Sequence, residues 1–217
     1  MTLVSWQFVG GPGAWSYRVF DALRRRLARR LVRDLATMTR LPRGARVLEG
    51  GSGPGYASSL FAGRPEVRLS VAVDADIGAL REARRRDRRL PVVVGDLLRL
   101  PFRDGAFDLV WNSSTLEHVD APGDALAEMR RVTRAAGHVF VGVPHRFGAL
   151  AFQPLIAGTR WGIWIGPVFD ARRLTALMVG AGLTPISHGT YGYGVFLGVL
   201  GLKPMSSTSH ASCGAHA

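Results

Sequence analysis

The sequence predicts an α/β fold: a doubly wound, mostly parallel sheet with helices on both faces. Short apolar strands alternate with helical segments from residue 46 to residue 181, and a glycine-rich loop follows the first strand. The chain then ends in two consecutive strands with no helix between them. Alternating strands and helices are typical of a parallel sheet. The short link between the last two strands makes that pair antiparallel.

Length and composition are those of one globular domain. The 217 residues can bury a sizeable core, and 47% of them are hydrophobic. Cys213 is the only cysteine, which excludes an intrachain disulfide and a cysteine-based zinc site, and no metal site is predicted. The first residues do not resemble a signal peptide, and no apolar run reaches the roughly 20 residues of a spanning helix. We therefore expect a cytoplasmic protein.

Residues 17–39 are predicted to form an amphipathic helix. Its apolar residues, from Phe20 to Met38, recur at spacings of three and four, with arginines around them. The net charge is +12, and Lys203 is the only lysine. Such a basic face suits RNA or an anionic membrane surface. We favour the simpler interpretation, in which the apolar stripe packs on the sheet and the arginines are solvated. Residues 1–40 are thus expected to pack on the core and cover the site.

The predicted elements follow a turn at residues 41–44. The strands are expected at 46–49, 68–73, 91–94, 107–112, 138–143, 183–187 and 193–200. The helices are expected at 54–62, 76–86, 123–133 and 171–181. Residues 204–217 form a small, polar tail without periodicity, which we expect to be disordered.

The loop after the first strand is built for close approach of a ligand. It runs from Glu49 to Gly55, and glycine occupies positions 50, 51, 53 and 55. Glycine permits positive φ angles, and the start of the next helix offers unpaired N–H groups. The dinucleotide fingerprint G-x-G-x-x-G/A fits poorly, because Tyr56 or Ser58 falls at its last position. The spacing that fits is an acid followed by glycines at 51, 53 and 55.

Carboxylates also follow the next two strands. Asp74 stands about where a doubly wound fold places the acid that binds ribose hydroxyls. Asp76 is the better candidate for the cap of the following helix. Asp96 and Leu97 follow the third strand and open a stretch that continues to Val110.

Together these motifs resemble the class I S-adenosylmethionine-dependent methyltransferases, and most closely the broad small-molecule group that includes the ubiquinone/menaquinone-type enzymes. Besides the glycine loop, the resemblance rests on Leu-Pro-Phe at 100–102, Phe-Asp-Leu-Val at 107–110 and Leu-Glu-His-Val at 116–119. It covers residues 45–144 and implies a Rossmann-like sheet of seven strands with an antiparallel last strand. Residues 41–203 would form the methyltransferase domain.

The resemblance also implies the cofactor, S-adenosyl-L-methionine, and the residues that bind it. The glycine loop with Glu49 would hold the methionine part, Asp74 the ribose, and Asp96 with Leu97 the adenine. The full set of implied cofactor-binding residues is Glu49, Gly51, Ser52, Gly53, Gly55, Asp74, Ala75, Asp96, Leu97 and Asn112. The segment 112–115 is Asn-Ser-Ser-Thr rather than Asn/Asp-Pro-Pro-Tyr, which disfavours methylation of amide or base nitrogens.

Methyl transfer from a sulfonium is an in-line displacement in which proximity and orientation supply much of the catalysis. A base is needed only if the acceptor loses a proton. His118 and His145 follow the fourth and fifth strands and are the catalytic candidates, although a lone loop histidine is more often structural.

The acceptor is predicted to be a small, apolar or aromatic molecule. Aromatic residues gather near the N-terminus, in the last turn and in a predicted lid at 144–170, regions that cover the acceptor pocket in the family that the chain resembles. Filling of the core is the alternative role. These residues are Trp6, Phe8, Trp15, Tyr17, Phe147, Phe152, Trp161, Trp164, Phe169, Tyr191 and Tyr193.

Three other functions are kept as alternatives. They are an RNA methyltransferase that uses the basic helices, a non-catalytic relative that binds only cofactor or partner, and a nucleotide-dependent oxidoreductase. Nucleic acid is disfavoured as a partner, because the residues outside the core are too few for an added RNA-binding module.

Overall fold

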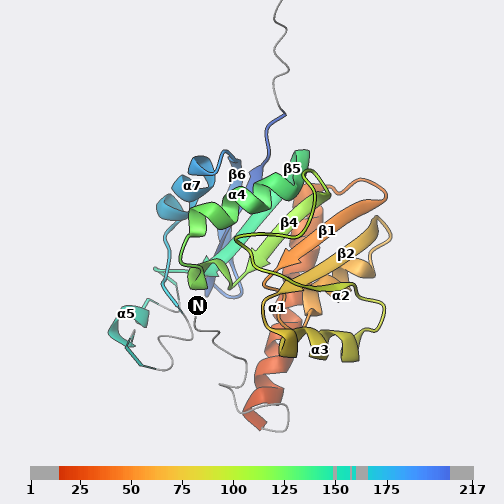
Figure 1. The fold of residues 1–217 in the computed structure, drawn as a ribbon. Coiled ribbons are helices and arrows are strands. Elements are labelled where there is room, and N and C mark those ends of the chain that lie inside the picture. Colours follow the sequence, from red (N-terminus) through yellow and green to blue (C-terminus); the bar gives the residue numbers. More distant parts are fainter. Residues whose placement is uncertain (1–14, 149–150, 157, 160–165, 206–217) are drawn as a thin grey trace, which may run out of the picture.

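A seven-stranded sheet forms the centre of the molecule (Figure 1). The computed structural model describes residues 15–148, 151–156, 158–159 and 166–205. The strand order is β3-β2-β1-β4-β5-β7-β6. The strands are β1 (Ala45–Gly50), β2 (Val67–Asp74), β3 (Val92–Val94), β4 (Phe107–Ser113), β5 (Thr133–Pro144), β6 (Thr184–Tyr191) and β7 (Phe196–Leu202).

The pairing of the strands confirms the predicted fold class. Strands β1 to β5 pair in parallel, whereas β7 lies between β5 and β6 and is antiparallel to both. The sheet is therefore mostly parallel, with an antiparallel last strand. Parallel strands end at one edge, which brings the residues after β1, β2, β3 and β4 together.

Helices cover both faces of the sheet (Figure 1). On one face, α1 (Trp15–Thr39) and α2 (Tyr56–Ala62) pack on Val47, Leu109 and Trp111, and α3 (Ile77–Arg86) packs at the edge. On the other face lie α4 (Pro122–Val132) and α7 (Ala171–Gly180), which bury the alternate strand residues. The short helices are η2 (Leu116–His118) and α5 (Gln153–Ile156).

The amphipathic stripe of α1 is buried over only part of its length. Leu31 and Leu35 are buried against the sheet, as expected, but Leu23 and Met38 are each 45% exposed. Figure 1 shows the first turns of α1 extending beyond the edge of the sheet, which accounts for exposure near its start, whereas Met38 lies in its last turn. The arginines at 25, 26, 29, 30 and 33 are exposed, in agreement with the solvated face that the sequence favoured.

Pairing between distant segments extends two strands beyond their apolar runs. Strand β5 begins at Thr133, five residues before the predicted start at 138, because Thr133 pairs with Phe107 and Ala136 bonds to Lys203. Strand β6 continues to Tyr191, opposite Phe196 of β7. Helix α5 was not predicted from the sequence. No helix in the described ranges is long and apolar enough to cross a lipid bilayer.

Candidate functional site

The loop after β1 takes a conformation that requires glycine. Gly51, Gly53 and Gly55 have φ angles of 69°, 52° and 67°, in the left-handed region that side chains disfavour. The Ser52 N–H donates to the Val73 carbonyl and the Gly53 N–H donates to Asp74 Oδ2 at 2.7 Å. These bonds hold the loop against the end of β2. Ser52 itself is buried, with 7% of its surface exposed.

Glu49 is a buried carboxyl at the end of β1. Its Oε2 accepts a hydrogen bond from Ser58 Oγ in the first turn of α2. Burial raises the pKa of Glu49 to about 8, and the bonds from Ser58 oppose that shift only in part. Glu49 therefore connects β1 to the start of α2 and keeps the glycine loop between them in place.

Asp74 and Asp76 were the sequence candidates for a ribose-binding acid and for the cap of the next helix. Asp76 Oδ1 accepts from the N–H groups of Gly78 and Ala79, so Asp76 is the N-cap of α3, as predicted. Asp74 faces the glycine loop, and Asp74 Oδ1 accepts from the Asp76 N–H at 2.8 Å. Burial raises the pKa of Asp74, and these backbone bonds oppose the rise. A carboxylate offers about four acceptor positions, so capacity remains for a ligand. Ala75 lies half-buried between the two acids.

Leu97 lies beside the start of the glycine loop, and Asp96 precedes it in the chain. A Cβ at Gly50 would stand 2.5 Å from Leu97 Cδ1, so Leu97 covers the end of β1. Asp96 is exposed, and its Oδ1 accepts from the Leu98 N–H. Arg131 of α4 secures this segment by donating to the carbonyls of Leu100 and Phe102.

Asn112 is a β4 residue, one position after Trp111, which pairs with Glu49 of β1. It is fully buried beneath α4, and its Nδ2 donates to Met129 Sδ at 3.5 Å. Its Oδ1 has no hydrogen-bond partner within the described ranges. The following Thr115 is the residue of this segment that approaches the loop, because Thr115 Oγ1 donates to the Gly51 carbonyl at 3.3 Å.

The two candidate histidines stand after β4 and β5. His118 ends η2, and burial lowers its pKa, which favours a neutral ring. His145 follows β5, its Nδ1 is buried, and no hydrogen-bond partner for that atom is present in the described part of the chain. Beside His118 is a residue for which the sequence analysis gave no role. Glu117 is only 6% exposed, and burial raises its pKa to about 8. Its only sequence signal was membership of the Leu-Glu-His-Val motif.

Tyr191 crosses the sheet to reach β4. Its hydroxyl lies 2.6 Å from Ser113 Oγ and passes over Gly142 of β5, where a Cβ would collide with it. Its ring contacts Phe140 and stacks on Phe196. Burial raises the pKa of Tyr191, so the hydroxyl stays protonated.

The other predicted acceptor aromatics separate into two groups. Phe147, Phe152 and Tyr193 are exposed, by 73%, 48% and 64%, whereas Phe169 is buried in the core. The Phe169 N–H donates to the Pro144 carbonyl at the end of β5. Phe169 therefore lies beside the end of β5, although 24 residues of chain separate the two residues. The remaining aromatics lie outside the described residues or have side chains that do: Trp6, Phe8, Trp15, Tyr17, Trp161 and Trp164.

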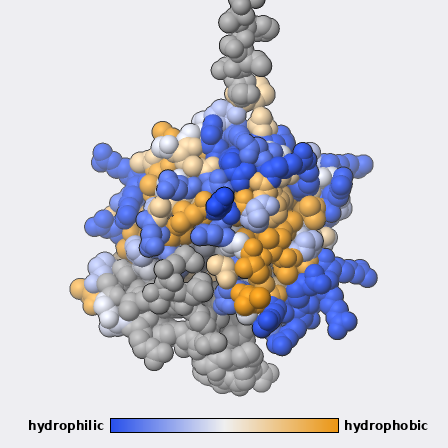
Figure 2. All heavy atoms as spheres, viewed as in Figure 1, coloured by the Kyte–Doolittle hydropathy of each residue, from blue (hydrophilic) through white to orange (hydrophobic). Residues whose placement is uncertain are grey.

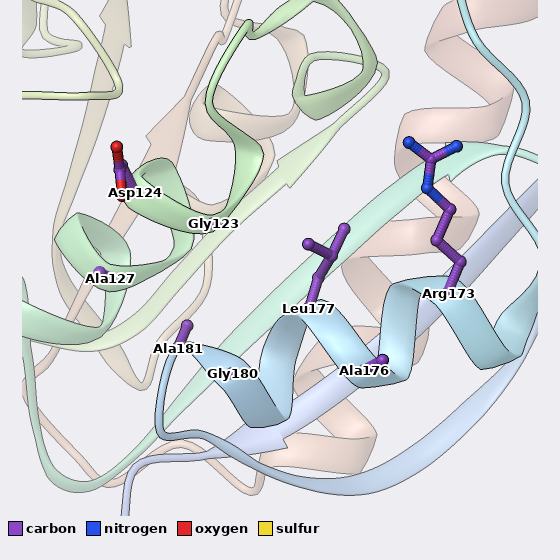
Figure 3. A pocket seen from close by; sticks show the side chains of 8 residues that line it. All are labelled: Gly123, Asp124, Ala127, Arg173, Ala176, Leu177, Gly180 and Ala181. Atoms are coloured by element: carbon purple, nitrogen blue, oxygen red, sulfur yellow. The ribbon is translucent and has the colours of Figure 1, made fainter.

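A groove of about 550 Å³ lies between α4 and α7, away from these residues (Figure 3). Arg173 and Leu177 of α7 and Asp124 and Ala127 of α4 are among the residues that line it. None of its lining residues belongs to the carboxyl ends of β1, β2 or β4. In the described ranges, no group of three His, Cys, Asp or Glu side chains is placed to hold a metal ion.

Comparison with known proteins agrees with this geometry. Residues 48–141 match the family model of a methyltransferase domain. A demethylmenaquinone methyltransferase of Renibacterium salmoninarum is 40% identical over 99 residues, which are 45% of this chain and 40% of that protein. A malonyl-[acyl-carrier protein] O-methyltransferase of Laribacter hongkongensis is 33% identical over 138 residues, which are 57% of this chain and 45% of that protein. The chain thus spans less than half the length of these two curated relatives.

A solved structure shares the fold over most of both chains. It is a methyltransferase of Thermotoga maritima, described as S-adenosylmethionine-dependent and as a possible histamine N-methyltransferase. Its TM-score is 0.67 at 24% identity, and the match covers 86% of this chain and 93% of that one. At this identity the likeness shows the fold alone.

The fold, the glycine loop and the strand-end acids define a class I S-adenosylmethionine-dependent methyltransferase domain. Residues 48–141 match the model of the methyltransferase domain family, and a similar protein of Mycobacterium tuberculosis is named a probable S-adenosylmethionine-dependent methyltransferase, so the implied cofactor is S-adenosylmethionine. The residues present fit that cofactor. The glycine loop presents backbone to a ligand at positive φ angles, and Asp74 beside it keeps acceptor positions that suit the ribose hydroxyls of the cofactor.

Proposed function

We propose that the whole protein transfers the methyl group of S-adenosylmethionine to a small, apolar or aromatic acceptor. The observation that carries this proposal is the glycine loop, with three positive φ angles, bonded directly to the acid at the end of β2. Such a loop brings backbone rather than side chains against a ligand. Proximity and orientation at the strand ends would then supply much of the rate acceleration.

The cofactor would lie across the ends of β1, β2 and β3. Gly51, Gly53 and Gly55, with Ser52, would contact its methionine part, and buried Glu49 would support that loop through Ser58. Asp74, with Ala75, would receive the ribose hydroxyls on its remaining acceptor positions. Leu97, which covers Gly50, and the neighbouring Asp96 would bound the adenine. Asn112 contributes least to this proposal, since its side chain points beneath α4.

The acceptor is proposed from this chain's own surface, because the two relatives are named for different acceptors. Phe147, Phe152 and Tyr193 expose their rings in the segments that follow β5 and β6. Exposed aromatic rings beside a polar site favour an acceptor with an apolar or aromatic body.

An RNA acceptor remains a second candidate because one observation favours it. Arg24 and Arg25 of α1 and Arg86 of α3 all approach the Tyr56 ring, so the basic surfaces of these helices meet beside the glycine loop. The same arginines are the basis for proposing contact with an anionic membrane surface.

Calorimetric titration of S-adenosylmethionine tests the proposal. We expect the wild type to bind and Asp74→Asn to lose at least about tenfold in affinity, or roughly 1.4 kcal/mol. Asp34→Asn is the matched control, because Asp34 lies on α1 and forms only partly exposed ion pairs, with Arg33 at 3.5 Å and Arg30 at 3.9 Å. Thermal unfolding of each variant is recorded as well, because Asp74 also bonds the Gly53 and Asp76 amides.

The outcomes separate the possible functions. A folded wild type that does not bind S-adenosylmethionine overturns the proposal, and binding of NAD(P) in its place would support the oxidoreductase. Cofactor binding without transfer of labelled methyl to any hydrophobic acceptor or RNA indicates a non-catalytic relative. If Asp74→Asn and the wild type bind S-adenosylmethionine with equal affinity, only the proposed contact between Asp74 and the ribose is refuted.

A further inference from the structure

Glu117 is a buried acid for which the described structure provides no counter-charge. It lies in η2, directly after β4, and both carboxyl oxygens are buried without a hydrogen-bond partner from any other described residue. The raised pKa of Glu117 comes from burial, opposed only by its own backbone N–H, and no described cation contributes. A buried polar group without a partner costs free energy. Because Glu117 lies at the strand ends, where the cofactor is proposed to bind, we expect a ligand to supply the missing hydrogen-bond partner of its carboxyl group.

The groups around Glu117 place it beside both the cofactor loop and Tyr191. Thr115, two residues earlier, donates to the Gly51 carbonyl. Gly166 packs on the other side, where a Cβ would stand 3.0 Å from Glu117 Cγ and 2.9 Å from His118 Cε1. The pKa of Tyr191 is raised mainly by burial and in part by the negative charge of Glu117, which shows that the two side chains lie near each other.

The other titratable groups on neighbouring elements do not neutralise Glu117. Burial lowers the pKa of His118 and so favours its neutral form. The Tyr191 hydroxyl is hydrogen-bonded to Ser113 Oγ. His145 stands at the end of β5, and Asp124 of α4 is turned to the groove between α4 and α7. A ligand group that donates a hydrogen bond would therefore meet a carboxylate without a competing partner in the described residues.

We propose that Glu117 forms the acceptor subsite, where its carboxylate binds the hydroxyl group of a phenol-type acceptor and takes its proton during methyl transfer. This inference rests on the proposed function. The acceptor O–H bond breaks, and its proton passes to a Glu117 oxygen. The electron pair left on the acceptor oxygen forms the bond to the methyl carbon as the bond from that carbon to sulfur breaks. The products are the methyl ether and S-adenosylhomocysteine, and Glu117 returns its proton to water.

The test uses 1-naphthol, its methyl ether 1-methoxynaphthalene, and 1-naphthylmethylamine as fluorescent probes. Their binding to the full chain is measured with saturating S-adenosylhomocysteine from about pH 6 to about pH 8.5. We expect the wild type to prefer 1-naphthol to the ether by at least about tenfold at the upper pH. That preference should rise with pH, because the Glu117 carboxylate forms as the pH approaches about 8.

Glu117→Gln should make this preference independent of pH, since the amide does not titrate. Glu82→Gln on α3, where Glu82 pairs with Arg86, is the matched control and should behave as the wild type. A merely structural role for Glu117 would not produce a pH-dependent preference for one probe. Equal binding of naphthol and ether by the wild type, or an unchanged pH profile in Glu117→Gln, would overturn the proposal. A stronger preference for the amine would overturn the hydroxyl assignment.

Two further measurements keep this result separate from the proposed function. S-adenosylmethionine binding is measured by calorimetry in the same samples. If the wild type binds the cofactor but does not prefer naphthol, only the role of Glu117 fails, whereas absent cofactor binding fails the proposed function itself. If Glu117→Gln does not fold, Glu117→Met has a similar volume and needs no hydrogen-bond partner, and the same loss of pH dependence is expected.

Discussion

At the scale of single residues, both the backbone conformation and the packing at position 51 require glycine. Its φ is 69°, and a Cβ would stand 2.2 Å from Thr115 Cγ2. We expect Gly51→Ala to lower the free energy of unfolding by about 1–3 kcal/mol and to weaken S-adenosylmethionine binding. Gly180→Ala is the matched control, because Gly180 ends α7 with no atom within 4 Å of a Cβ. Urea unfolding and calorimetry check both variants, and equal losses in the two would contradict this account.

The buried acids predict how stability depends on pH. Burial raises the pKa of Glu117 from 4.5 to about 8, so the folded chain keeps a proton that the unfolded chain has lost. Its contribution is complete below about pH 4.5 and is lost as the pH rises toward 8. Glu117→Gln should therefore reduce the fall in the free energy of unfolding between about pH 5 and about pH 7.5, by up to about 1.4 kcal/mol per pH unit. Urea unfolding of the cofactor-free chain measures this, and parallel pH profiles would refute it.

At the scale of elements, Tyr191 connects β6 to β4 across two intervening strands. This requires Gly142 of β5, where a Cβ would stand well inside contact distance of the Tyr191 hydroxyl. We expect Gly142→Ala to cost about 1–3 kcal/mol of stability, because the ring must move. Tyr191→Phe keeps the ring and loses the Ser113 bond, at about 1 kcal/mol. Gly189→Ala in β6 meets no atom within 4 Å and serves as the control. Thermal unfolding ranks the three, and a Gly142→Ala variant as stable as the control would contradict the crossing.

The same elements show what the sequence can and cannot predict. Periodicity located every strand and the longer helices, because apolar alternation reports burial directly. It placed the start of β5 late, since residues 133–137 are ordered by pairing with β4 and Lys203 rather than by their own apolarity. The Ser113–Tyr191 contact joins positions 78 residues apart, and local pattern carries no information about it. Glu117 was missed for a related reason: only the three-dimensional structure shows that both of its oxygens are buried without a partner in the other described residues.

At the scale of the whole molecule, charge is distributed unevenly between site and surface. Buried carboxyl groups gather at the strand ends, whereas the arginines of α1 and α3 are mostly exposed. Figure 2 shows hydrophilic residues projecting where α3 lies in Figure 1. The Arg86 guanidinium lies 3.7 Å from the centre of the Tyr56 ring, and Arg24 and Arg25 of α1 approach the same ring. The basic surfaces of α1 and α3 are therefore continuous beside the glycine loop, and a polyanion there would be attracted by charge alone.

That surface predicts weak, salt-dependent RNA binding without sequence preference. Each phosphate contact with single-stranded RNA contributes about 0.7 to the slope of log affinity against log salt. Arg84, Arg85 and Arg88 are exposed on or just after α3, so changing all three to Gln should reduce that slope by up to about 2. Changing the scattered, exposed Arg43, Arg103 and Arg172 to Gln alters the net charge equally and should reduce the slope less. Poly(U) and a mixed-sequence RNA of the same length should bind alike, because arginines that contact only phosphates do not read bases. A clear preference for one RNA, retained at high salt, would instead favour RNA as the acceptor and reverse the choice of a small molecule.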